Sequence, residues 1–136
     1  MNKIIFLLLC IILLSCQKEE IKLNSPNGVE FFKSTEKMRE EVKNVIKNDF
    51  GNLKEIKIKD VKYFEDKVKS IGLVTYEANG VEHSNILFLV TAKEKTSFKC
   101  TASSCLCRID IFLDSNGQYA YECGGCNTDC HWEIIQ

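Results

Sequence analysis

Six closely spaced cysteines are the residues of this sequence best suited to chemistry. They lie near the C-terminus with the spacing C-x4-C-x-C-x15-C-x2-C-x3-C. The set comprises Cys100, Cys105, Cys107, Cys123, Cys126 and Cys130. Sulfurs that converge in a fold can form disulfides, bind a metal ion or act as a reactive dithiol. The local structure around them and the compartment of the chain decide among these three possibilities.

The segment between Cys107 and Cys123 predicts a β-hairpin. Residues 108–113 and 118–122 mostly alternate polar and apolar side chains, as half-buried strands do. Between them stands Asp-Ser-Asn-Gly, in which Asn and Gly tolerate a positive φ. We therefore expect a three-residue loop at residues 115–117.

The apolar side chains set the register of this hairpin. A loop at residues 115–117 places Ile111 opposite Tyr121 and Ile109 opposite Cys123, whereas other loop lengths lose the match between Ile111 and Tyr121. The open end of the hairpin then gathers the sulfurs of Cys105, Cys107, Cys123 and Cys126. We expect bridges between the first two and the last two, with the connectivity left open. The remaining pair, Cys100 and Cys130, is expected just outside, free to pair together or with the core.

The N-terminus indicates the compartment. A basic start is followed by an apolar run at residues 4–14, which is too short to span a bilayer stably. The run ends in Leu13-Leu14-Ser15-Cys16. This pattern resembles the bacterial lipobox, in which a small residue precedes a cysteine that is lipidated before cleavage on its amino side. The resemblance implies a signal peptide at residues 1–15 and a lipid anchor, such as palmitate, on Cys16.

The residues after Cys16 suggest a location outside the cell. Gln17-Lys18-Glu19-Glu20 resembles the acidic export tag of surface-exposed lipoproteins in Bacteroidota. The resemblance implies an outer-membrane lipoprotein whose domain faces the medium. Residues 16–28 are polar and are expected to form the lipidated tether between membrane and domain.

This compartment favours disulfides over the two alternatives. Cys10 leaves with the signal peptide and Cys16 carries lipid, so an even number of cysteines remains in an oxidising environment. The first alternative is a tetrahedral zinc site. Its four thiolate ligands would be Cys105, Cys107, Cys123 and Cys126.

The second alternative is thiol–disulfide exchange. Cys123-Gly-Gly-Cys126 has the C-x-x-C spacing of thiol oxidoreductases, with Cys123 as nucleophile and Cys126 as resolving thiol. Those enzymes place the first cysteine at a helix amino end, whereas a predicted strand precedes Cys123 here. Of the two histidines, His83 lies beside a predicted turn and is expected on the surface.

The best helix signal lies at residues 34–49. Ser34 is suited to accept hydrogen bonds from the first free amides, and Glu36 suits the positive end of the helix dipole. The apolar side chains of this segment recur with a helical period. They are Met38, Val42, Val45, Ile46 and Phe50.

Three strand-like segments follow the helix, at residues 53–63, 68–78 and 81–92. The alternation slips near Lys59, which predicts a bulge or break in the first strand. Asn79-Gly80 predicts a two-residue hairpin between the other two. The third segment contains five consecutive apolar residues and is expected to be a central strand, covered by the helix on one side.

Residues 29–136 therefore predict a single α+β domain, in which one helix packs on a curled antiparallel sheet and the C-terminal part, residues 100–131, forms a cysteine-rich hairpin. This element order resembles the cystatin-like and NTF2-like rolls, an analogy of architecture alone. With 18 basic and 19 acidic residues, the chain lacks the basic excess that nucleic-acid binding needs. We expect a disulfide-stabilised binding module rather than an enzyme, with a protein or small molecule as its ligand.

Overall fold

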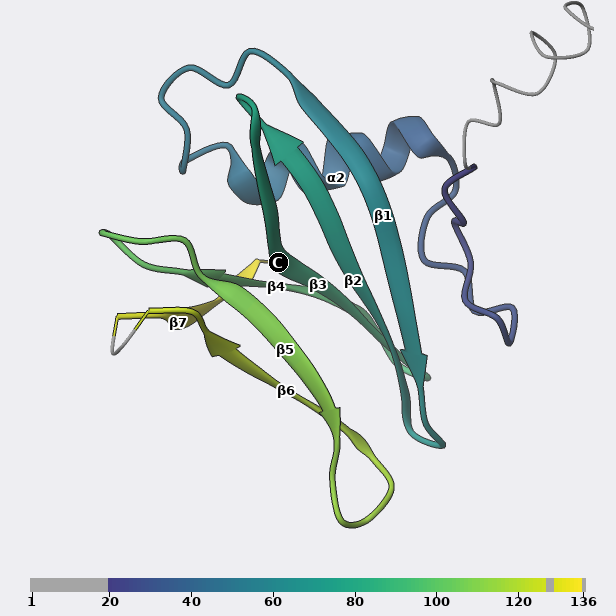
Figure 1. Cartoon of the computed structure of the whole chain (residues 1–136). Coiled ribbons are helices and arrows are strands. Elements are labelled where there is room, and N and C mark those ends of the chain that lie inside the picture. The colour runs from purple at the N-terminus through teal and green to yellow at the C-terminus, as the bar shows by residue number, and fades with distance from the viewer. Residues whose placement is uncertain (1–19, 127–128, 136) are drawn as a thin grey trace, which may run out of the picture.

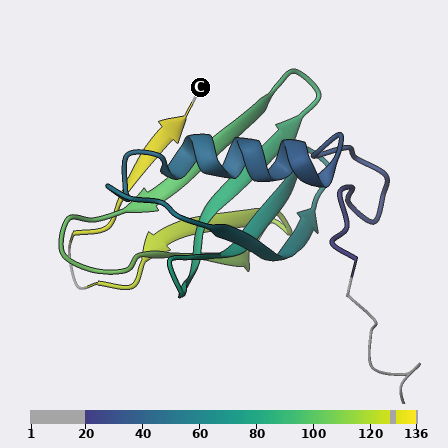
Figure 2. The ribbon, with the colours of Figure 1, turned by 90° about the horizontal axis from the view of Figure 1, so that it is seen from above.

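The computed structural model describes residues 20–126 and 129–135, which form a small α+β domain. Its elements are α2 (Thr35–Ile46), β1 (Ile56–Glu65), β2 (Lys69–Ala78), β3 (Val81–Thr91), β4 (Lys95–Thr101), β5 (Arg108–Leu113), β6 (Tyr119–Gly124) and β7 (His131–Ile135). Five strands form an antiparallel sheet in the order β1-β2-β3-β4-β7, and β5 and β6 form a separate two-stranded sheet. Helix α2 covers one face of the large sheet and the β5–β6 hairpin covers the other (Figures 1 and 2).

The helix forms where its sequence signals lie. The Ser34 hydroxyl accepts a hydrogen bond from the amide of Lys37 at 3.1 Å, and Glu36 lies in the first turn. Four side chains of the apolar stripe are buried against the sheet, namely Met38, Val42, Val45 and Ile46. The predicted helix and its inward face are confirmed, although the helix ends three residues before the expected Asp49.

The local turn signals also form the predicted connections. The pairing of β1 with β2 shifts between Ile58 and Asp60, at the expected slip. Ala78 pairs with Val81 across a two-residue turn. Asn79 and Gly80 have φ values of 50° and 82° there, which suits a hairpin turn of the primed type.

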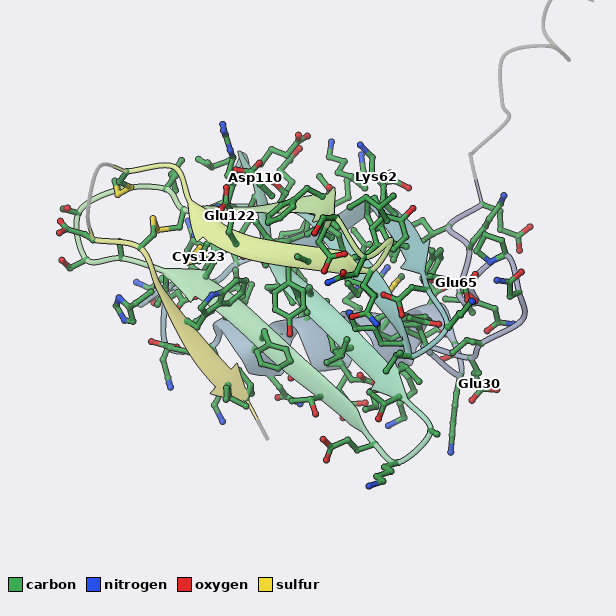
Figure 3. All side chains as sticks on the ribbon, turned by 90° about the horizontal axis from the view of Figure 1, so that it is seen from below. Glu30, Lys62, Glu65, Asp110, Glu122 and Cys123 are labelled. Carbon is green, nitrogen blue, oxygen red and sulfur yellow. A yellow bond between two sulfur atoms is a disulfide. The ribbon has the colours of Figure 1, made fainter. Side chains whose placement is uncertain are left out.

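The β5–β6 hairpin has the predicted register. Ile111 pairs with Tyr121 and Ile109 pairs with Cys123. Ile109 is buried against the large sheet, whereas Asp110 and Glu122 lie on the hairpin's outward face, with the sheet and the helix behind them (Figure 3). The alternation that predicted the strands thus separates a covered face from a solvent face.

Strands β2 and β3 carry apolar side chains on both faces, and two apolar clusters result. The helix-side cluster includes Phe31, Met38, Val74, Tyr76, Ile86 and Phe88. The hairpin-side cluster includes Ile71, Leu87, Cys100, Cys107 and Ile109. A sheet with two apolar faces requires cover on both sides, which the helix and the hairpin supply.

The prediction of a three-stranded meander was incomplete. Strand β4 pairs with β3, and β7 pairs with β4 at the far side of the sheet. The turn between β3 and β4 spans only residues 92–94, because Lys95 and Thr96 already pair with β3. The β5–β6 hairpin separates β4 from β7 in the sequence. No local turn signal therefore predicts the pairing of β7 with β4.

The described part of the expected tether, residues 20–28, lies against the domain. Ile21 and Leu23 pack on the helix-side cluster, and Tyr63 donates its hydroxyl hydrogen to the Lys22 carbonyl at 2.6 Å. Ser25 is buried and donates to the Glu65 carboxylate at 2.5 Å; Figure 3 labels Glu65 beside this segment. Residues 21–25 therefore belong to the packed domain and do not form a free tether.

Asp66 ties the turn between β1 and β2 to the hairpin. Its side chain is 4% exposed, and its two oxygens accept hydrogen bonds from the amides of Val68, Lys69 and Tyr119 at 2.8, 3.0 and 3.0 Å. The Lys69 ammonium lies 3.1 Å away. Burial disfavours the charge, but these donors prevail and lower the pKa of Asp66 to about 2.

Replacement of this carboxylate, Asp66→Asn, is expected to destabilise the domain by about 2 kcal/mol near neutral pH. The folded-state pKa lies below the ordinary value of 3.8, so the contribution is present above about pH 4 and is lost as the pH falls towards 2. Urea unfolding across this range should show wild type and variant converging in acid. Asp60→Asn, on an exposed residue of β1, is the control, and a constant gap for Asp66→Asn would contradict the assignment.

Candidate functional site

All six cysteines of the C-terminal stretch are paired. The bridges are Cys100–Cys123, Cys105–Cys126 and Cys107–Cys130. The first joins β4 to β6, across the two sheets. The other two join the loop between β4 and β5 to the loop between β6 and β7. The structure thus supports the predicted disulfide-stabilised domain.

The connectivity differs in part from the expected grouping. Cys105 pairs with Cys126 across the hairpin end, as expected, but Cys107 pairs with Cys130. Cys100 and Cys130, which the sequence left free to pair together, each take a different partner. The reason is the β4–β7 ladder, which the sequence analysis missed. Its last pair, Thr101 with His131, brings residue 130 to the loop that carries Cys107.

The C-x-x-C motif does not form its own bridge. Cys123 and Cys126 bond to Cys100 and Cys105, respectively. A C-x-x-C oxidoreductase cycles a bridge between its own two cysteines, with the first at a helix amino end. Here Cys123 lies on strand β6, so the predicted roles of nucleophile and resolving thiol have no support in this geometry.

Four sulfurs nevertheless lie in one group. The sulfurs of Cys105, Cys107, Cys126 and Cys130 are all within 4.8 Å of one another. This set differs by one member from the predicted zinc ligands, because Cys130 takes the place of Cys123. Cys123 belongs instead to a group with Cys100 and Cys130. In the disulfide state none of these sulfurs is a thiolate, the form in which cysteine binds zinc.

A small pocket of about 150 Å³ adjoins the cysteine cluster. One wall comes from the segment after the helix (Asp49, Phe50), another from β2 and β3 (Tyr76, His83, Asn85), and a third from the cysteine-bearing loop (Ala102, Cys105, Leu106, Cys107). We take the cysteine-stapled end of the domain as the candidate functional site, because this pocket adjoins both the cysteine cluster and the buried polar side chains of Tyr76, His83 and Asn85. We call this hollow the loop pocket.

A buried chain of hydrogen bonds forms one side of the loop pocket. Tyr76 donates its hydroxyl hydrogen to Asn85 Oδ1 at 2.9 Å, and Asn85 Nδ2 donates to the Cys100 carbonyl at 3.0 Å. Burial, with a smaller contribution from the charge of Asp49, raises the pKa of Tyr76 above its ordinary value. The sequence offered one signal for this site, a lone Asn before the apolar run of β3, and its role was missed.

His83 is not the surface residue that its place beside a turn predicted. It is 8% exposed, stacks on Tyr76 with ring centroids 5.1 Å apart, and meets Phe50 edge-on at 5.5 Å. Its Nε2 is buried and has no hydrogen-bond partner among the residues that the structure describes. Burial lowers the pKa of His83, and the charge of Asp49 opposes this only in part. Burial thus favours the neutral form of the ring.

A buried lysine fixes the other side of this region. The Lys99 side chain is 4% exposed, and its ammonium lies 2.6 Å from Asp49 and 2.8 Å from Glu133. Burial alone would lower the pKa of Lys99, but hydrogen bonds and charge from the two carboxylates raise it instead. This network joins the segment after α2 to β4 and β7, and so holds Asp49 at the pocket wall.

No protein-family model, curated protein or solved structure matches this chain. The proposed lipidation site, Cys16, and the rest of the lipobox lie outside the described residues. Within residues 20–126 and 129–135, no helix has the length and apolar character needed to cross a membrane.

The lowered pKa of His83 predicts a pH-dependent stability. In the unfolded chain His83 takes up a proton near its ordinary value of 6.5, whereas the folded state resists protonation. Stability is therefore highest above that value and falls as the pH drops below it. The variant His83→Phe keeps an aromatic ring on Tyr76 but cannot titrate.

Chemical unfolding between about pH 5 and pH 8 is the measurement. The unfolding free energy of the wild type minus that of His83→Phe should decrease as the solution is acidified. Titration of His131 cancels in this difference because both proteins contain it. Parallel curves across the range would show that His83 is not a buried neutral ring.

Proposed function

We propose that this chain is a lipid-anchored lipoprotein of the bacterial outer membrane and that its domain is a disulfide-stabilised binding module. The lipobox-like pattern ending at Cys16 supports the anchor, and Lys18-Glu19-Glu20 supports exposure to the medium. The three bridges support a location outside the reducing cytoplasm.

The side of the domain from which the N-terminal segment leaves supports the cysteine-stapled end as the binding end. The segment at residues 20–28 lies on one side of the domain, and the loops that carry the cysteines lie on the other (Figures 1 and 2). A domain tethered through Cys16 therefore offers these loops to partners away from its point of attachment.

The exposure of Leu106 beside the loop pocket is the observation on which the proposal rests. This side chain lines the loop pocket and is 62% exposed, although it stands between two bridged cysteines. Bridges on both sides restrict the loop, so little conformational entropy is lost when a partner covers it. An exposed apolar side chain on a rigid loop beside a hollow gives a partner apolar area to cover at a small entropic cost.

The size of the loop pocket favours a protein partner over a small-molecule ligand. Pockets for small molecules typically hold about 300–1,000 Å³, whereas this one holds about 150 Å³. That space suits one side chain of a partner, with the rest of the contact made on Leu106 and the surrounding loops. We therefore propose a protein partner that places a single side chain in the loop pocket.

Metabolic labelling tests the anchor. Cells that express the full chain with an alkyne fatty acid should label the protein through Cys16, and Cys16→Ala should abolish the label and leave the unprocessed chain. Cys10→Ala, in the apolar run, is the matched control and should keep the label. Digestion of the labelled protein by protease added to intact cells supports surface exposure. Unchanged labelling of Cys16→Ala would refute the anchor.

Site-specific photo-crosslinking tests the binding face. A photoreactive residue at Leu106 should give a defined protein adduct on intact cells, whereas one at Leu113 should not. Leu113 is the matched control because it is similarly exposed, 58% against 62%, but lies at the tip of the hairpin. The variant Ala102→Phe, which fills the loop pocket, should remove the Leu106 adduct. Equal adducts at both leucines, or an adduct insensitive to Ala102→Phe, would contradict the proposal.

A further inference from the structure

We propose that the two outer bridges, Cys105–Cys126 and Cys107–Cys130, are the oxidised form of a four-thiolate zinc site. All four sulfurs lie within 4.8 Å of one another, and Cys126 Sγ lies 3.6 Å from Cys130 Sγ. Tetrahedral zinc with bonds of about 2.3 Å places its sulfur ligands roughly 3.8 Å apart. Once the two bridges open, small side-chain rotations suffice to bring the sulfurs to this spacing.

The backbone holds these sulfurs together without help from the two bridges. The loop that carries Cys105 and Cys107 begins after Thr101 and ends before Arg108, and both of these residues lie in strand ladders. Thr101 pairs with His131, and Arg108 pairs with Gly124. These partners bracket the second loop, which carries Cys126 and Cys130. Each loop is therefore fixed to the other at both of its ends.

Gly125 brings the two loops into direct backbone contact. Its φ is +118°, a conformation that favours glycine, and a Cβ at this position would lie 3.0 Å from the Leu106 carbonyl oxygen and 3.4 Å from the Arg108 nitrogen. Leu106 stands between the two ligands of the first loop, so this approach occurs directly beside Cys105 and Cys107 along the chain. The absence of a side chain at residue 125 permits it.

The position of the third bridge, Cys100–Cys123, should let it stay intact under a reduction that opens the outer two. Cys100 is fully buried in the hairpin-side cluster, and its partner Cys123 is only partly accessible on strand β6. Cys107 is also buried, but its partner Cys130 and both members of the Cys105–Cys126 bridge are partly accessible. All four of these cysteines lie on loops rather than in strands, so an attacking thiolate can approach each outer bridge with less opening of the sheet. The Cys100–Cys123 bridge would thus keep the hairpin on the sheet while the outer sulfurs change state.

The chemistry is balanced by two dithiol molecules and one metal ion. Each outer bridge takes two electrons and two protons from a dithiol, which leaves as a disulfide, and four thiols result. Zn²⁺ then binds the four sulfurs as thiolates and releases four protons to solvent. In the reverse direction two disulfide molecules take up four electrons from the four thiolates and four protons from solvent, leave as dithiols, and so expel the metal and restore the two bridges. This metal site goes beyond the proposed binding function and does not depend on it.

Graded reduction followed by metal titration tests the site. The full-length protein, purified in detergent, is reduced with dithiothreitol, desalted without oxygen and titrated with Co²⁺ and then Zn²⁺. One equivalent of Co²⁺ should give the charge-transfer and d–d bands of a tetrahedral thiolate site, and Zn²⁺ should abolish them. Native mass spectrometry should find one zinc per chain with one bridge intact.

Cysteine mapping identifies the ligands. Zinc should protect Cys105, Cys107, Cys126 and Cys130 from alkylation, while Cys100 and Cys123 stay bridged. The variant Cys105→Ser/Cys126→Ser should lose the cobalt spectrum, whereas Ser104→Ala, in the same loop, should keep it. Protection that includes Cys123, metal binding that survives the double substitution, or unfolding on reduction as judged by circular dichroism would each overturn the proposal.

Discussion

The structure depends on covalent attachment of the β5–β6 hairpin to the sheet face opposite the helix. In the part of the chain that the structure describes, no backbone ladder joins this hairpin to the five-stranded sheet. A two-stranded hairpin alone is marginally stable in water. The Cys100–Cys123 bridge and the cluster around Ile109 hold it in place instead. A bridge spanning 23 residues stabilises a fold by about 3 kcal/mol on the chain-entropy account.

The same attachment explains why β2 and β3 can be apolar on both faces. Ile71 and Leu87 would face water without the hairpin, while Val74 and Ile86 face the helix. Where the hairpin meets β4 and β7, aromatic rings continue the contact. Phe98, Tyr121 and Trp132 lie with their ring centroids 5.5–6.2 Å apart, in tilted and edge-on arrangements. Each sheet thus supplies the apolar surface that the other one needs.

Local signals predicted much of this fold, and long-range pairing accounts for the rest. The helix cap at Ser34, the slip near Lys59 and the hairpin register around Ile111 each depend on neighbouring residues, and each was predicted from the sequence. Strands β4 and β7 were missed because β4 is rich in polar residues and the β7 residues that pair with it lie 30 to 38 positions further along the chain. The disulfide connectivity depends on that ladder, so it remained open as well. The burial of His83 was missed because Phe50, which covers it, comes from a distant segment.

The loop between β4 and β5 belongs to both the loop pocket and the proposed zinc site. A change at one of these sites therefore acts on the other through this loop. Cys105 and Cys107 line the loop pocket and also take part in the two outer bridges. Any change in those bridges alters the restraint on Leu106, which stands between them. A partner that binds the restrained loop more tightly than the relaxed one must, by linkage, also favour the oxidised bridges. The proposed binding function and the proposed redox change of the sulfurs would therefore be coupled to the extent that the partner distinguishes the two loop states.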